Sequence, residues 1–221
     1  MQAKTSPAVE DYLKGLYILG SEGAGGPVST TSLAAHLGVA AASATNMLKR
    51  LAAAGLVAHV PYKGAELTVA GRRVALEVVR HHRLLETYLA QALDVPWDEV
   101  HAEAEVLEHV LSEELEERIS ARLGHPTADP HGHPIPARDL SMPRRSTRLL
   151  WEASDGEMVT VDRVSDSKGE VLRYLGELGI RPGARLRIVR RGPVGGPLFV
   201  RVDDGQEEAM SKELAETVWV A

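Results

Sequence analysis

The chain has 221 residues, of which 44% are apolar and 25% charged, with a formal charge of −6 and no cysteine. This length exceeds one typical domain of about 100 to 150 residues, so we expect two or three small domains. No segment approaches the roughly 18 consecutive apolar residues of a membrane span, and the N-terminal segment lacks the pattern of a secretory signal, so we expect a cytoplasmic protein. The absence of cysteine excludes disulfides and thiolate-ligated metal centres, so any metal must be held by His, Asp and Glu.

The charge is unevenly distributed along the chain. Residues 1–75 carry a formal charge of +3, residues 76–145 carry −7 and residues 146–221 carry −2. Seven of the nine histidines lie between positions 81 and 133. This distribution fits a basic N-terminal module that contacts phosphate, followed by a segment that attracts cations.

Three helices are predicted in the N-terminal third. A proline followed by two acidic residues predicts a helix from Pro7 to about Gly20. A run of Ser and Thr predicts a second helix start near residue 29, and Gly38 separates this short helix from a longer one at about 41–54. A short helix, a glycine turn and a longer helix form the layout of a helix-turn-helix.

A wing and two long helices are expected next. The apolar stretches 56–60 and 66–69 flank the turn residues 61–64, which predicts a hairpin. Helical periodicity then predicts one helix from about 68 to 92 and a second, uninterrupted one from about 97 to 123.

The last part of the chain is predicted to be mostly β. Prolines between 126 and 143 cannot hold a helix, so we expect loop and linker there and a domain boundary near 143–150. Short alternating stretches then predict the strands of a small barrel, with one helical patch at 171–175. The predicted strands lie at 158–161, 185–189, 198–202 and 217–220.

The outward face of the 41–54 helix is small, polar and basic. Ser, Thr and Asn hydrogen-bond base edges, methyl groups of Ala and Thr contact thymine, and Lys and Arg contact phosphate. The predicted DNA-contacting residues are Thr30, Thr31, Ala42, Ser43, Thr45, Asn46, Lys49, Arg50 and Lys63. The alternative is an ordinary solvated face of a helical hairpin, but the glycine turn, the hairpin and the +3 charge favour DNA.

Ligand-type residues cluster in the two long predicted helices. In the second helix they have i, i+4, i+7, i+8 spacing, which places them on one stripe beside an apolar stripe. They are His101, Glu105, Glu108 and His109, with His82 and Glu86 on the preceding helix. A set of His and carboxylates suits Mn(II), Fe(II), Co(II) or Zn(II), and its oxygen-rich character favours Mn(II). Each residue alone is more often a solvated charge than a ligand, but six on adjacent helices predict a metal site.

The sequence resembles a family of metal-dependent repressors that includes the diphtheria toxin repressor and the manganese transport regulators. The resemblance covers nearly the whole chain and rests on five segments. These are EDYL at 10–13, the helix-turn-helix, HHRLLE at 81–86, the run from His101 to Ser112, and HGHPIP at 131–136. The segment 172–183 is similar to an SH3-like domain that longer members share with a ferrous-transport accessory protein.

The resemblance implies a mainly α protein with a small β part. The expected domains are a winged helix-turn-helix at 1–75, a helical dimerisation and metal-binding domain at 76–145, and an SH3-like barrel at 146–221. It also implies a homodimeric repressor of metal-uptake genes that binds palindromic double-stranded DNA when loaded with metal. The implied primary metal site comprises Asp11, His82, Glu105, Glu108 and His109, and the implied ancillary site Glu86, His101, Asp129, His131 and Asp166.

Two positions bear on the metal. Iron-responsive members carry Met and Cys where this sequence has Asp11 and Glu105, which favours Mn(II) over Fe(II), Co(II), Zn(II) or Cd(II) as the effector. Short manganese regulators carry a second carboxylate where this sequence has Lys14, which argues against a two-metal cluster there. Other interpretations are an Fe(II)-responsive member, a His/carboxylate metalloenzyme with the helix-turn-helix as scaffold, and a winged-helix protein that needs no metal.

Overall fold

The computed structural model describes residues 5–22, 26–60, 62–143, 145–203 and 205–221. Pro61 of the predicted hairpin turn and Arg144 of the predicted linker lie outside these residues. Contacts divide the chain into two compact units. Unit 1 comprises Met1–His81, Glu108–Leu111 and Pro136–Ser141, and unit 2 comprises His82–Leu107, Ser112–Ile135 and Met142–Ala221. The boundaries of the three domains expected from the sequence stay a prediction.

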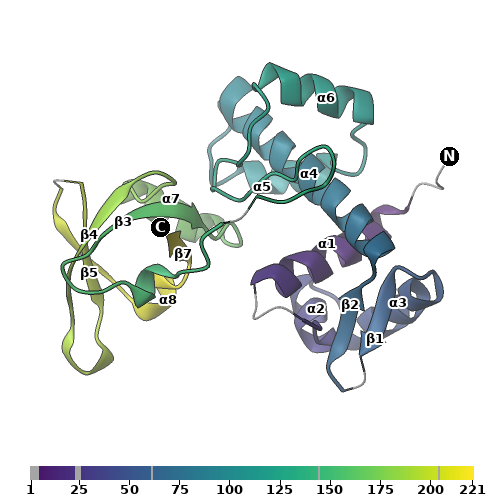
Figure 1. The fold of residues 1–221 in the computed structure, drawn as a ribbon, viewed down its shortest axis with the longest axis horizontal. Coiled ribbons are helices and arrows are strands. Elements are labelled where there is room, and N and C mark those ends of the chain that lie inside the picture. Colours follow the sequence, from purple (N-terminus) through teal and green to yellow (C-terminus); the bar gives the residue numbers. More distant parts are fainter. Residues whose placement is uncertain (1–4, 23–25, 61, 144, 204) are drawn as a thin grey trace. The chain divides into compact units, whose positions relative to one another are not determined.

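Unit 1 contains the predicted helix-turn-helix and wing. Its elements are α1 (Pro7–Glu22), α2 (Thr30–His36), α3 (Ala41–Ala53), β1 (Val57–Val60), β2 (Gly64–Leu67) and the first half of α4 (Val69–Ala92). α1 packs against α2 and β2, and α3 packs against α2 and β1. The ribbon in Figure 1 shows the two-stranded wing beside α2 and α3. The predicted order of elements is confirmed in this unit.

Short-range signals in the sequence define the turn of the helix-turn-helix. Ser29 caps α2 by accepting a hydrogen bond from the Ser32 amide at 3.0 Å. Gly38 has φ +64°, a conformation that glycine adopts without strain, and it turns the chain between α2 and α3. Leu13 and Leu33 are fully buried in α1 and α2, which pack against each other, so the first helix is part of the core of unit 1.

The strand bounds of the wing differ slightly from the predicted ones. β2 begins at Gly64 rather than at residue 66, and Val69 belongs to α4. Ala65 forms a β-bridge with Val28, and Gly64 pairs with Val60 of β1. Gly64 therefore passes close to the backbone of Val28. A Cβ atom at Gly64 would lie 2.0 Å from the Val28 carbonyl oxygen, and φ there is +121°. A glycine is therefore required at this position.

The predicted single helix over residues 97–123 is wrong. The structure has α5 (Val100–Leu107) and α6 (Glu113–Arg122), separated by a turn. Ser112 is the N-cap of α6: its side chain accepts a hydrogen bond from the Leu115 amide at 3.3 Å, and acidic residues follow in the first turn of the helix. This cap competes with continuation of α5. Glu108 and His109 therefore lie beyond the end of α5, not on its face.

The C-terminal part of unit 2 forms a five-stranded antiparallel sheet in the order β6-β5-β4-β3-β7. The strands are β3 (Met158–Val164), β4 (Arg185–Arg191), β5 (Leu198–Val202), β6 (Glu207–Met210) and β7 (Val218–Val220). Irregularities in the β3–β7 and β4–β5 pairings bend the sheet, as a small barrel requires. The four predicted strands are confirmed, whereas β6 and the short α8 (Lys212–Ala215) were not predicted from the sequence.

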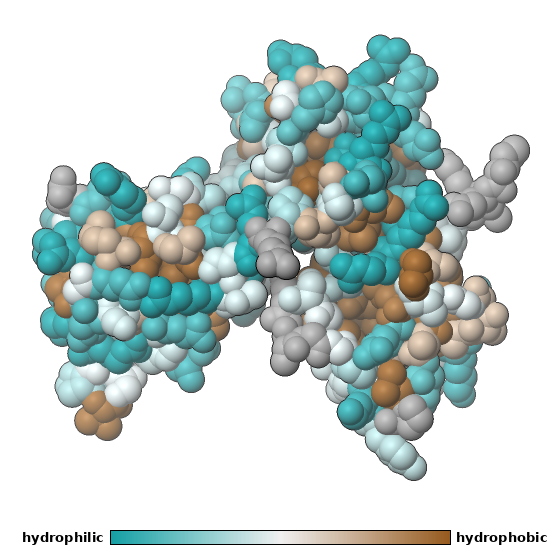
Figure 2. Space-filling model, in the orientation of Figure 1, coloured by the Kyte–Doolittle hydropathy of each residue, from teal (hydrophilic) through white to brown (hydrophobic). Residues whose placement is uncertain are grey.

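This sheet encloses its own apolar core. Alternate residues of the strands, together with Leu172 and Leu175 of α7 (Gly169–Glu177), are fully buried. Most side chains on the visible face of this strand-rich segment are hydrophilic (Figure 2). The core and the polar surface together agree with the expected SH3-like barrel, and the mainly α fold class with a small β part is confirmed. None of the described helices is long and apolar enough to cross a membrane.

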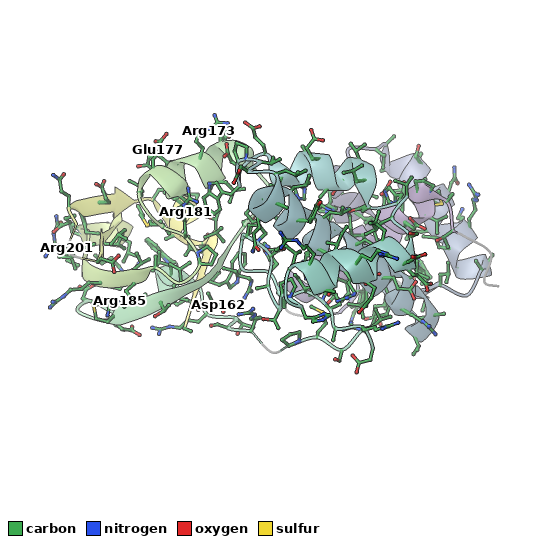
Figure 3. The ribbon with its side chains drawn as sticks, turned by 90° about the horizontal axis from the view of Figure 1, so that it is seen from above. Asp162, Arg173, Glu177, Arg181, Arg185 and Arg201 are labelled. Carbon is green, nitrogen blue, oxygen red and sulfur yellow. The ribbon has the colours of Figure 1, made fainter. Side chains whose placement is uncertain are left out.

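Residues of α7 and of the turn after it join the sheet to the earlier part of unit 2. Arg173 of α7 binds Asp98, with 3.0 Å between Nε and Oδ2, and the Arg181 guanidinium lies 4.5 Å from the centre of the Trp97 ring. Figure 3 labels Arg173 and Arg181. These contacts fix the segment that follows β3 against residues 97–98.

Candidate metal centres and DNA-binding surface

One ligand cluster lies in unit 1 and joins α1 to the turn after α5. His109 Nε2 is 2.9 Å from Asp11 Oδ1 and 3.6 Å from Glu108 Oε1. One ligand-type atom from each of Asp11, Glu108 and His109 lies within 4.8 Å of the others. The structure therefore brings together three of the residues predicted for the primary site, and two of them follow directly in the chain.

Two neighbouring residues shape this cluster, and neither was predicted as part of it. Glu10 Oε2 accepts a hydrogen bond from His109 Nδ1 at 2.7 Å, which leaves Nε2 to face Asp11 and Glu108. A carboxylate on the far nitrogen is the usual means of orienting a metal-binding imidazole. Lys14 Nζ lies 2.6 Å from Glu108 Oε1, and both side chains are almost fully buried. The cluster therefore contains an internal positive charge.

His82 and Glu105, the other two predicted primary ligands, belong to unit 2. There His82 Nε2 lies 3.0 Å from both Glu86 Oε1 and His101 Nδ1. Glu105, with 41% of its side chain exposed, lies 3.7 Å from His101 Nε2. Their membership of the primary site stays a prediction.

A second cluster in unit 2 is centred on Glu86, whose side chain is fully buried. His101 Nδ1 and His82 Nε2 are 3.1 Å and 3.0 Å from Glu86 Oε1. Burial raises the pKa of a carboxyl, but His82, His101 and His131 outweigh this effect and hold the pKa of Glu86 well below its ordinary value. Glu86 is therefore an ionised acceptor in a low-dielectric position.

The loop at 126–135 adds three buried ligand-type residues. Asp129 Oδ1 accepts hydrogen bonds from the backbone amides of His131 (2.8 Å) and His133 (3.0 Å), which folds the loop back on itself. Arg83 donates to the Pro134 carbonyl at 2.6 Å and ties the loop to α4. One ligand-type atom from each of Asp129, His131 and His133 lies within 4.8 Å of the others.

One ring nitrogen of His131 has a hydrogen-bond partner. Its Nε2 lies 2.7 Å from the Trp97 carbonyl oxygen, which can only accept, so Nε2 carries a proton. Its Nδ1 faces Glu86 Oε1 at 3.8 Å, which is too long for a hydrogen bond. A cation or a proton between these two buried atoms would satisfy both of them.

Asp166, from the segment after β3, completes this second cluster. Its Oδ2 lies 3.6 Å from His133 Nδ1 and 3.9 Å from His101 Nδ1. Burial alone would raise the pKa of Asp166, but the histidines, led by His133, hold it below its ordinary value. Burial would lower the pKa of His133, but Asp166 and Asp129 raise it above its ordinary value. The structure thus gathers all five predicted ancillary residues in unit 2.

The donor set fits a divalent cation. Four buried ligand-type atoms of the second cluster have no hydrogen-bond partner within the described part of the chain. They are Glu86 Oε2, Asp129 Oδ2, His131 Nδ1 and His133 Nδ1. Asp129 Oδ2 also lies 3.7 Å from Arg83 Nε, as an ion pair. Buried polar atoms without a hydrogen-bond partner are costly, and a bound cation would satisfy such atoms. Oxygen and imidazole donors without thiolates suit Mn(II) and similar ions.

The predicted DNA-contacting face is exposed on α3. Ala44, Leu48 and Leu51 are buried, whereas the residues predicted to contact DNA point outward. Ala42, Ser43, Thr45, Asn46, Lys49, Arg50, Thr31 and Lys63 are exposed, and Thr30 is partly exposed. Ala40 precedes α3 without a side-chain cap, so its first amides are open to a phosphate. This surface has the shape and charge of a major-groove reader.

Sequence reasoning assigned no contact in these clusters to three residues that the geometry brings there. Glu10 and Lys14 flank the predicted ligand Asp11 on α1, and i, i+3 or adjacent positions on that helix are the signal that could have found them. His133 follows His131 at i+2 in a loop bounded by Gly and Pro, which is also a ligand spacing. Periodicity could not find these residues because hydrogen-bond partners from distant segments determine their orientation.

Comparisons with known proteins agree with these features. Three family models match the chain: "Iron dependent repressor, N-terminal DNA binding domain" over residues 4–65, "Iron dependent repressor, metal binding and dimerisation domain" over 68–137, and "FeoA domain" over 148–221. The iron-dependent repressor IdeR of Mycobacterium leprae is 32% identical, over 96% of this chain and 95% of the relative. The chain belongs to the diphtheria toxin repressor family. It is therefore a member of a family of metal-dependent, DNA-binding transcriptional repressors.

The names of other members of the family record iron, manganese or no metal. The diphtheria toxin repressor of Corynebacterium efficiens is 30% identical, over 81% of this chain and 82% of the relative. A solved structure described as a manganese-dependent transcriptional repressor in complex with manganese is 43% identical, with a TM-score of 0.90, and covers 96% of this chain and 99% of that one. Both iron-dependent and manganese-dependent members are thus similar to this chain over most of its length.

Proposed function

We propose that this chain is a manganese-responsive repressor whose DNA binding depends on metal held by the first cluster. Asp11 of α1, with Glu108 and His109, would hold the ion, and His82 and Glu105 are the further predicted ligands. The bound cation would supply positive charge that links α1 to residues 108–109. Asp11 would then restrain α1, and through α1 the helices that it packs against.

The observation that carries this proposal is the double role of α1. The helix presents Asp11 to Glu108 and His109, and it buries Leu13 and Leu16 in the core of the DNA-binding unit. Gly15 allows α2 to approach closely, because a Cβ there would lie 3.1 to 3.2 Å from His36 and Leu33 atoms. A ligand that favours one position of α1 therefore favours one arrangement of α2 and α3.

The donor chemistry supports Mn(II) as the effector. Asp11, Glu108 and the predicted ligand Glu105 supply hard oxygen donors, and the chain has no cysteine. The 43%-identical manganese-dependent structure supports the same choice. Fe(II) is the second candidate, because the 32%-identical relative is named an iron-dependent repressor. Co(II), Zn(II) and Cd(II) would act as substitutes.

Dimerisation and a palindromic operator are part of the proposal. A family model described as a dimerisation domain matches residues 68–137. Val106 and Leu115 in this range are 73% and 49% exposed, and a dimer interface would cover apolar side chains of this kind. A two-fold dimer would read two half-sites about one helical turn, or a multiple of it, apart. Such a regulator would act in the cytoplasm, with the DNA that it binds.

The proposal predicts metal-dependent operator binding. Fluorescence anisotropy with a labelled palindromic segment of the protein's own promoter should give 5- to 150-fold tighter binding with Mn(II) than with chelator, the range typical of allosteric coupling. The same titration with Fe(II) and Zn(II) ranks the effectors. Asp11→Asn should lose the response, whereas Glu103→Gln, which removes an exposed carboxylate of α5 outside the clusters, should keep it. Equal affinity in chelator would contradict the proposal.

The exposed cations of α3 predict a salt effect. Lys49→Ala or Arg50→Ala should weaken operator binding and reduce the slope of log K against log salt by about 1 for each DNA phosphate that the protein no longer neutralises. Arg118→Ala on α6, an exposed arginine paired with Glu114, is the matched control and should leave the slope unchanged. A slope equal to that of the unmodified protein in both α3 variants would show that these two residues do not touch the DNA backbone.

A further inference from the structure

Lys14 places a positive charge inside the first cluster, for which the proposed function uses only carboxylates and an imidazole. Its Nζ lies 2.6 Å from Glu108 Oε1, and the two side chains are 7% and 0% exposed. The same Oε1 atom lies 3.6 Å from His109 Nε2, the ring nitrogen that also faces Asp11. The ammonium therefore contacts the carboxylate oxygen that lies toward the other ligand-type atoms.

The ammonium lowers the negative charge that this cluster offers to a metal. Three carboxylates lie within 3.6 Å of the His109 ring nitrogens, those of Glu10, Asp11 and Glu108. An imidazole that binds metal is neutral, so the formal charge of the cluster is set by these carboxylates and by Lys14. Charges interact more strongly in a protein interior than in water. The buried ammonium therefore repels a metal ion that approaches Glu108.

Lys14 and the predicted ligand Asp11 come from the same helix. They are three positions apart on α1, so their side chains lie on one face of it. A metal held by Asp11 and Glu108 would join α1 to the turn after α5. The contact between Lys14 and Glu108 makes the same connection without metal. The ammonium and the metal thus serve as alternative cations for one buried carboxylate.

We propose that Lys14 is a tethered cation that competes with the effector metal for Glu108, and so sets the metal concentration at which the repressor responds. The inference rests on the proposed function, because the first cluster must hold the effector. The ammonium stabilises the metal-free cluster at every metal concentration, since it is part of the chain. The apparent affinity for metal falls by the fraction of molecules in which Lys14 holds Glu108. A higher metal concentration is therefore needed for DNA binding.

The test compares Lys14→Gln with the unmodified full-length protein. Glutamine keeps a hydrogen-bond donor for Glu108 but removes the charge. Mn(II) binding is followed by the electron paramagnetic resonance signal of free Mn(II), and should be tighter by roughly ten-fold or more, because a repelling charge is lost. The melting temperature should fall in chelator and return toward that of the unmodified protein in saturating Mn(II). Lys49→Gln, the same change at an exposed lysine of α3, should alter neither quantity.

Equal or weaker Mn(II) binding in Lys14→Gln would overturn the proposal, because Lys14 would then only support the fold. Lys14→Met repeats the measurement with an uncharged side chain of similar length, in case the glutamine variant does not fold. Adding His109→Ala should abolish the gain in affinity, which locates it in the first cluster. If His109→Ala alone leaves Mn(II) binding unchanged, the first cluster does not hold the metal, and the proposed function fails together with this inference. If it weakens binding but Lys14→Gln does not tighten it, only this inference fails.

Discussion

Replacing Glu108 by Gln is expected to remove the metal response and to destabilise the metal-free protein. Glu108 supplies a carboxylate oxygen to the first cluster, so the 5- to 150-fold stimulation expected from metal should fall to within about two-fold. Its side chain is also fully buried against the Lys14 ammonium. Removing one partner of a buried pair costs about 3 kcal/mol or more, which lowers the melting temperature of a chain of this size by roughly 6 to 12 °C.

The double variant Lys14→Met/Glu108→Gln separates the two effects. It removes both charges, so most of the lost thermal stability should return while the metal response stays absent. The measurements are thermal unfolding in chelator and anisotropy with and without Mn(II). A Glu108→Gln protein that still responds to metal would exclude this carboxylate from the site. A double variant no more stable than Glu108→Gln would exclude Lys14 as the cause of the destabilisation.

The second large effect is expected for Gly132→Ala. This glycine has φ +89°, and a Cβ there would lie 2.3 Å from the Asp162 carbonyl oxygen and 2.8 Å from the Arg163 Cα. Next to it, the His131 carbonyl accepts the Val164 amide of β3 at 2.9 Å. An alanine must therefore push the loop away from β3, which separates Asp129 and His131 from Asp166.

Gly183→Ala provides a matched control for this prediction. Gly183 has φ +88°, but a Cβ there would meet no atom within 4 Å. Alanine at either position bears the cost of a left-handed backbone, about 1 to 2 kcal/mol, and only Gly132→Ala adds the clash, about 1 to 3 kcal/mol more. Denaturant unfolding measures this difference, and Mn(II) binding to the second cluster should weaken at least ten-fold in Gly132→Ala alone. Equal behaviour of the two variants would contradict the close approach.

Local signals in the sequence predicted most of the fold. The Ser29 cap, the Gly38 turn and the alternating strands 158–161 and 185–189 are each determined by residues close in the chain, and the structure agrees with them. The helix predicted over 97–123 failed because apolar periodicity continues through a break that one capping serine, Ser112, introduces. Periodicity does not detect a cap when the residues after it are also helical.

The sequence predicted which residues belong to the candidate sites, but it did not predict the contacts that these residues make. The sequence pointed to Asp11, Glu108 and His109, and the structure brings them together in unit 1. It could not identify Glu10 or Lys14 as partners of this cluster, because those contacts connect residues 99 and 94 positions apart. A resemblance by motif likewise could not give the unpaired nitrogen of His133, which depends on how the loop folds around Asp129.

The turn between α5 and α6 gives the ligand pair a particular tolerance to insertion and deletion. One residue inserted within a helix rotates everything after it by about 100°, which would turn ligands on that helix away from their partners. Glu108 and His109 lie after the last residue of α5 and before the Ser112 cap, so a change in length between His109 and Ser112 alters the course of the turn and leaves α5 intact. During evolution, the reach of these two ligands could therefore be adjusted to ions of different radius without rebuilding either helix.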